Sequence, residues 1–162
     1  APRLVLTLDS DRLDTDVMAR LTDVYPDGRS VFVTDGARRA RFRAGYEPED
    51  ELLLTPGEPF ELEIELEPTG VTFLAGHRLR LVLTTSNWPR FHVNPNDGGP
   101  LYSPDAQPMV VENRVHLGAD APSTLVLPVW PNTVFADGFE SGTPSAWSEV
   151  SPCCDGPETS RD

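Results

Sequence analysis

Acid–base chemistry in this sequence would most readily involve its three histidines, because imidazole is the side chain whose charge changes near neutral pH. His77 lies in AGHRLRL, His116 lies in NRVHLG, and His92 lies in the loop SNWPRFHVNPNDGG, residues 86–99. A serine nucleophile would need such a base and an orienting acid. The nearest match to the elbow G-x-S-x-G is GRSVF, residues 28–32, which lacks the second glycine and leads into a predicted strand. We therefore predict no catalytic residue, and we expect His77 and His116 to be structural or solvated.

A second candidate for chemistry is the acidic segment DSDRLDTD, which holds Asp9, Asp11, Asp14 and Asp16. Paired carboxylates can cleave glycosidic bonds, and carboxylate oxygens can bind calcium. The spacing does not match the EF-hand loop, which needs a glycine and a distal glutamate. We favour a solvated loop whose aspartates make Asx turns, and we predict neither a metal site nor a cofactor.

Charge and composition exclude several classes of protein. The formal net charge is −13, and all 13 basic residues are arginines. A surface this acidic repels phosphate backbones, so we predict no nucleic-acid partner. No apolar run approaches the ~18 residues of a transmembrane helix, so we predict no membrane span. Cys153 and Cys154 are the two cysteines and form neither a disulfide framework nor a metal-ligand pattern.

Almost every readable segment alternates apolar and polar residues, which is typical of half-buried strands. FELEIELE, residues 60–67, and RLRLVLT, residues 78–84, show this most clearly. No segment predicts a helix of three turns. Many short strands with glycine and proline turns between them predict an all-β sandwich or barrel. The other predicted strands are residues 3–8, 16–24, 30–34, 38–44, 71–74, 110–117 and 124–130.

Two of these strands carry opposite charges on their outer faces. Arginines alternate in RRARFRA, and glutamates alternate in FELEIELE. If residues 37–44 and 59–67 were neighbouring strands, the charges would form cross-strand pairs of roughly 0.2–1 kcal/mol each. Two separately solvated faces explain the pattern equally well.

The composition changes after Trp130-Pro131. Residues 132–162 hold six acids, one base and many proline, serine, glycine and threonine residues. We predict a folded domain over residues 1–131 and a flexible acidic tail over 132–162. Because the sequence opens almost directly inside a strand, we expect the chain to be part of a longer protein.

Four segments together resemble a known family. They are DTD at 14–16, LTDVYPDG at 21–28, FLAGHRLR at 73–80 and the loop 86–99. In this order and spacing they are similar to the C-terminal domain of the X-prolyl dipeptidyl-peptidase and cocaine-esterase-like acyl hydrolases, over residues 4–131. The resemblance implies a jelly-roll β-sandwich of the galactose-binding-like type. It also implies an α/β-hydrolase domain in the same parent protein, which holds the whole Ser-Asp-His triad and packs against this domain.

The loop after residue 85 supplies the candidate site of this domain. We expect a rigid corner that docks to the hydrolase domain or shapes its substrate cleft, although a local core plug explains the loop equally well. Trp88 and Trp130 could also stack on sugar rings. The alternatives are therefore a stand-alone carbohydrate-binding or protein-interaction module, and oligomerisation through the parent enzyme stays open. The candidate residues are Asn87, Trp88, Pro89, Arg90, Phe91 and His92.

The tail contains VFADGFESGTPSAWS, residues 134–148. It resembles a short segment found near the ends of many secreted bacterial proteins. The resemblance implies a secreted or cell-surface location in a bacterium.

Overall fold

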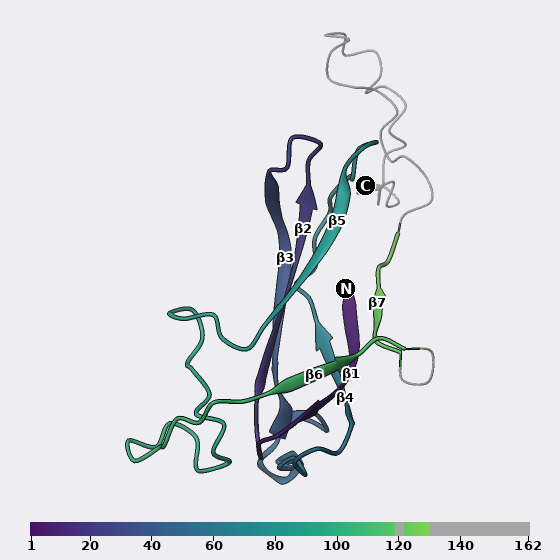
Figure 1. Ribbon diagram of the computed structural model, residues 1–162. Coiled ribbons are helices and arrows are strands. Elements are labelled where there is room, and N and C mark those ends of the chain that lie inside the picture. The colour runs from purple at the N-terminus through teal and green to yellow at the C-terminus, as the bar shows by residue number, and fades with distance from the viewer. Residues whose placement is uncertain (119–121, 130–162) are drawn as a thin grey trace, which may run out of the picture. The chain divides into compact units, whose positions relative to one another are not determined.

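The computed structural model describes residues 1–118 and 122–129, and its compact unit spans Ala1–Pro128 (Figure 1). The predicted tail, Trp130 and both cysteines lie outside the described residues. Two short 3₁₀ helices, Ala40–Phe42 and Pro48–Asp50, interrupt a chain of strands. No helix in the described part of the chain is long and apolar enough to cross a membrane. The strands are β1 (Arg3–Ser10), β2 (Asp16–Val24), β3 (Ser30–Arg39), β4 (Phe60–Glu65), β5 (Arg78–Thr84), β6 (Asn113–His116) and β7 (Thr124–Val126).

The strands form two antiparallel sheets (Figure 1). The first sheet has the order β4-β1-β6, with β7 also paired to β1. The second has the order β3-β2-β5. β1 and β2 follow each other in the sequence, yet each is the central strand of a different sheet. The short connection between them therefore joins the two sheets.

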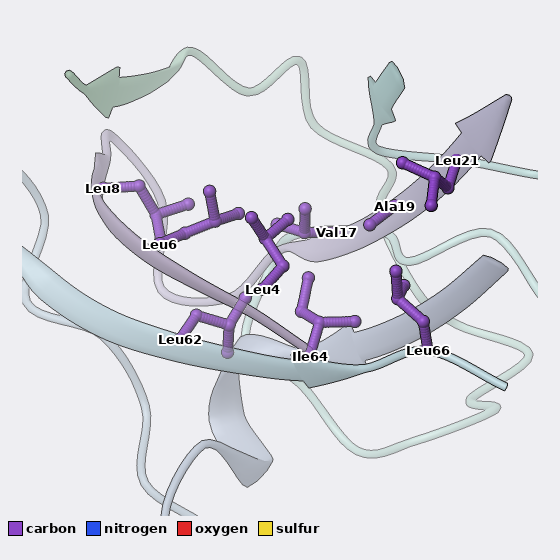
Figure 2. Packing of buried hydrophobic residues seen from close by; sticks show 9 residues of the cluster. All are labelled: Leu4, Leu6, Leu8, Val17, Ala19, Leu21, Leu62, Ile64 and Leu66. Atoms are coloured by element: carbon purple, nitrogen blue, oxygen red, sulfur yellow. The ribbon is translucent and has the colours of Figure 1, made fainter. Parts of the chain in front are cut away.

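The hydrophobic core lies between these sheets (Figure 2). β1 contributes every second residue, and β2 and the β4 segment do the same, because side chains of a strand alternate between its two faces. This confirms the predicted β-sandwich. The order of strands in a jelly roll is a finer assignment, and it stays a prediction. The core cluster consists of Leu4, Leu6, Leu8, Val17, Ala19, Leu21, Leu62, Ile64 and Leu66.

The predicted strand over RRARFRA is wrong in its second half. β3 ends at Arg39, and residues Ala40–Phe42 form a 3₁₀ helix. The backbone N–H of Ala40 donates to the carbonyl of Thr15, and the backbone N–H of Arg41 donates to the Asp14 carboxylate. These bonds to the β1–β2 connection satisfy the backbone where strand pairing would otherwise be needed.

Other predicted strands are shorter or absent. Residues 71–74 form no strand, residues 110–117 contain only the four-residue β6, and residues 124–130 contain only β7. The alternation in these segments is weak, and the regions are mostly exposed.

The pairing of the arginine and glutamate strands is also wrong. β3 and β4 belong to different sheets, and β4 pairs with β1 instead. Arg3 of β1, rather than an arginine of β3, lies 3.4 Å from the Glu63 carboxylate. The strand order of the sheets, rather than the opposite charges of β3 and β4, therefore determines which strand pairs with β4.

Gly36 of β3 marks a point where the two sheets come very close. A Cβ atom at this position would lie 2.1 Å from the backbone carbonyl oxygen of Glu65. We expect Gly36→Ala to lower the free energy of unfolding by about 1–3 kcal/mol, because backbone must move to admit the methyl group. Urea unfolding measures the change. Gly70→Ala is the control, since a Cβ there meets nothing within 4 Å. Equal losses in both variants would contradict the close approach.

Candidate functional site

The loop that follows β5 is tied to the second sheet at its start. The backbone N–H of Phe91 donates to the Asn87 carbonyl at 3.1 Å, which closes a turn around the cis Trp88–Pro89 peptide bond. The Arg90 guanidinium forms an ion pair with the buried carboxylate of Asp35 in β3. The candidate residues therefore lie on a turn that the sheet holds in place.

The end of the loop is held still more firmly. Asn94 is buried, and its side-chain amide donates to Asp14 at 2.9 Å and to Asp16 at 2.7 Å. Its side-chain oxygen accepts a hydrogen bond from the backbone N–H of Asn96 at 2.9 Å. The carboxylate of Asp97 accepts backbone hydrogen bonds from Gly99 and Gln107, which lower its pKa below the ordinary value. Trp88 therefore lies between β5, which ends at Thr84, and the anchored residues Arg90 and Asn94.

Next to these anchors, aromatic rings face solvent. The Trp88 side chain is 67% exposed, so it does not fill the core of the described residues. Its ring meets His92 edge-on with centroids 6.2 Å apart, and His92 meets Tyr102 in the same way at 5.2 Å. Arg90 covers the half-buried ring of Phe91 at 5.2 Å. We call Trp88, His92 and Tyr102 the aromatic cluster.

A cavity of about 350 Å³ opens beside the aromatic cluster. The loop 92–95 forms one wall, and residues 99–104 form another. Arg39 and Arg41 also line it. The arrangement presents aromatic and apolar surface above buried charges, which suits a contact surface or the wall of a cleft.

The charges under the loop form a network of buried ion pairs. Arg41 Nε donates to Asp14 at 2.7 Å, and the two side chains are only 2% and 0% exposed. Arg41 also contacts Glu51 at 2.7 Å. Arg39 binds Asp16 with two hydrogen bonds, of 2.7 and 2.9 Å, and this contact raises the pKa of Arg39.

The prediction of a solvated aspartate loop is therefore wrong for Asp14 and Asp16. Both carboxylates are buried, because Arg39, Arg41 and Asn94 supply the hydrogen bonds that water would otherwise provide. Within the described residues, no group of three potential ligands is placed to hold a metal ion.

Two of the three histidines, His77 and His116, each pair with an aspartate. His77 Nδ1 lies 2.8 Å from Asp23 with both side chains nearly buried, and its ring packs 4.2 Å from that of Tyr25. His116 Nε2 lies 2.9 Å from Asp9. Across residues 1–118 and 122–129, no serine or cysteine side chain is hydrogen-bonded to a histidine ring nitrogen. These pairs hold strands together, which agrees with the structural role expected for both histidines.

Sequence reasoning found the loop but missed several residues that build the site. Nothing in the pattern singled out Tyr102, which has a positive φ of 58°. Asn94 stands in a turn-rich segment, and its partner Asp14 is 80 residues away, so no local pattern connects the two. The one available signal was the matching spacing of Asp14-Thr15-Asp16, where β2 begins, and Arg39-Ala40-Arg41, where β3 ends.

The fold and the site define a class of protein, a β-sandwich domain that presents an anchored, partly exposed loop. The chain belongs to the family of X-Pro dipeptidyl-peptidase C-terminal non-catalytic domains, whose model matches residues 1–126. This confirms the family resemblance and the expectation of a non-catalytic domain.

Several longer proteins contain a segment that is similar to this chain. Cocaine esterase from Rhodococcus sp. (strain MB1 Bresler) is 37% identical over 125 residues, which are 76% of this chain and 21% of the esterase. The structure of an alpha-amino acid ester hydrolase is 25% identical with a TM-score of 0.74, over 80% of this chain and 22% of that chain.

An aminopeptidase from a marine sediment archaeon, Thaumarchaeota archaeon, is 24% identical with a TM-score of 0.69 and shares the fold. The match covers 76% of this chain and 22% of the aminopeptidase. The chain thus spans about a fifth of the length of the relatives it matches.

Proposed function

We propose that this domain packs on an α/β-hydrolase domain of the same parent protein and helps to shape its substrate cleft. The observation that carries the proposal is Trp88, an exposed aromatic side chain on a loop that starts from β5 and is anchored at Arg90 and Asn94. Aromatic side chains dominate the binding energy of many interfaces. A loop that is already ordered also loses little conformational entropy when it docks.

The proposed parent protein is a serine hydrolase that acts on an ester, an amide or an X-Pro dipeptide. Acyl transfer would use a serine, a histidine and an aspartate of the hydrolase domain. Two relatives are named as an esterase and an ester hydrolase, and the family name refers to a dipeptidyl-peptidase. The aromatic cluster and the cavity beside it would then contribute to one wall of the cleft. A jelly-roll order of strands, as in galactose-binding-like domains, belongs to the same proposal.

Substitution of Trp88 in the full-length parent protein tests the docking role. We expect Trp88→Ala to lower kcat/KM by roughly ten-fold, because an interface anchor contributes on the order of 1–2 kcal/mol. The control is Tyr46→Ala, since Tyr46 is 76% exposed and lies outside the aromatic cluster. Steady-state kinetics and thermal unfolding are measured together. Unchanged kinetics with lost stability would instead assign Trp88 to local packing.

A second candidate function is a stand-alone carbohydrate-binding or protein-interaction module. The exposed ring of Trp88 favours it, because such a ring can stack on the face of a sugar. Binding to immobilised glycans that Trp88→Ala abolishes would support this function over the first.

The proposal also places the parent protein outside the cytoplasm of a bacterium. The support is the tail segment 134–148, which lies outside the described residues, together with the bacterial esterase relative. Cell fractionation tests this, and recovery in the cytoplasm would contradict it.

A further inference from the structure

The outer face of the second sheet carries three exposed arginines. In the register of β2 with β5, Arg20 lies opposite Val82, and Arg80 lies opposite Thr22. Side chains of a strand alternate between faces, and Ala19 and Leu21 of β2 point into the core. The alternation therefore places Arg20, Arg78 and Arg80 together on the face that points away from the core. We call this the arginine face.

Positive charge on the arginine face is not neutralised within the described residues. None of its three arginines forms an ion pair there, whereas seven other arginines do. The nearby carboxylate of Asp35 is already bound to Arg90. Arg20 and Arg80 are diagonal cross-strand neighbours, a relation that places backbones roughly 7–8 Å apart, and their like charges repel. This arrangement is unexpected in a chain of net charge −13, because carboxylates are abundant elsewhere.

Exposed aromatic rings accompany these charges. Phe32 of β3 is 55% exposed and lies 5.9 Å from the Arg20 guanidinium. At one end of the face, Arg20 lines a pocket of about 100 Å³ together with Val82 and Asn87. Asn87 also begins the loop that presents Trp88. Arginine and large aromatic residues are the types most enriched among residues that dominate binding at interfaces.

We propose that the arginine face docks on an acidic surface of the hydrolase domain in the parent protein. This inference rests on the proposed function and extends it, since it names the face and the chemistry of its partner. Carboxylates of the partner pair with Arg20, Arg78 and Arg80, and an apolar recess receives Phe32. Pairing removes the repulsion among the arginines, and covering Phe32 removes an exposed apolar ring from water.

A second copy of the chain is a weaker partner for this face. The outer face of β4 carries Glu61, Glu63 and Glu65 and would match it in charge. Such a contact, however, joins two different faces of the protein. Copies would therefore add head to tail into an open filament, unless the rotation between successive copies closes a ring. Docking on the hydrolase domain of the same protein chain covers the arginine face without linking copies into a filament.

Hydroxyl-radical footprinting of the full-length parent protein tests the proposal. The oxidation rate of each aromatic residue in the native protein is compared with its rate in urea. We expect strong protection of Phe32 and Trp88 and little protection of Tyr46, which is 76% exposed. Protection of Trp88 without protection of Phe32 would overturn the docking of the arginine face and leave the proposed function standing. If neither Phe32 nor Trp88 is protected, the docking of the arginine face and the proposed function both fail.

Charge reversal separates this docking from other causes of protection. We expect Arg78→Glu with Arg80→Glu to abolish the protection of Phe32, and 0.5 M salt to weaken it, because salt screens such pairs. The control is Arg3→Glu with Arg114→Glu, which makes the same change of charge on the first sheet and should leave Phe32 protected. Circular dichroism checks that both variants keep their strands. Protection of Phe32 that persists in Arg78→Glu with Arg80→Glu would overturn the proposal. Protection that depends on protein concentration would also overturn it, because it would indicate a second copy of the chain as the partner.

Discussion

Arg41→Met is expected to lower the free energy of unfolding by about 3–5 kcal/mol, because it leaves a buried carboxylate without its partner. Arg41 and Asp14 are 2% and 0% exposed, and Arg41 Nε lies 2.7 Å from Asp14 Oδ2. Arg41 also donates to the Gly99 carbonyl at 2.9 Å, so the same change releases the end of the loop. Methionine keeps much of the apolar volume, and the loss therefore reports on charge and hydrogen bonding.

The matched control is Arg114→Met. Arg114 lies 2.7 Å from Glu112, yet these side chains are 69% and 66% exposed. An exposed ion pair contributes only about 0–1 kcal/mol, so we expect little change in stability. Urea unfolding of both variants gives the comparison. Similar small losses in the two would show that the Asp14–Arg41 pair is solvated in the protein and is not a buried anchor.

The sequence was sufficient to predict the sandwich, because alternation in a strand reports directly on burial. In β4, Leu62 and Ile64 are buried and Glu61 and Glu63 are exposed, as the period of two predicts. The loop after β5 could be located for a similar local reason, since its prolines and glycines interrupt an otherwise regular strand. Both features depend on neighbours in the sequence.

The partners of charged residues could not be predicted, because they depend on topology. The alternating arginines of RRARFRA predicted a strand with one charged face, but Arg41 turns inward to Asp14, 27 residues away. Asn94 reaches Asp14 across 80 residues. Sequence patterns show which side chains need partners, whereas the fold decides which partners are within reach. The arginine face depends in the same way on the register of β2 with β5, which the sequence alone does not show.

Leu6→Ala is expected to destabilise the domain by about 2–5 kcal/mol, because it removes buried methyl groups and leaves a cavity. Leu6 is 1% exposed and pairs with Leu62 of β4 in the centre of the core (Figure 2). The surrounding strands are hydrogen-bonded on both sides of β1, so they cannot easily collapse into the space. The midpoint of urea unfolding should fall while the slope stays constant.

Leu117→Ala is the control for this core substitution. Leu117 follows β6 and is 81% exposed, so its truncation removes little buried surface and should change stability by less than about 0.5 kcal/mol. A loss in Leu6→Ala no larger than that of Leu117→Ala would mean that the two sheets do not enclose a packed core. Since the anchors of the loop rest on those sheets, that result would also remove the basis for a preordered docking site.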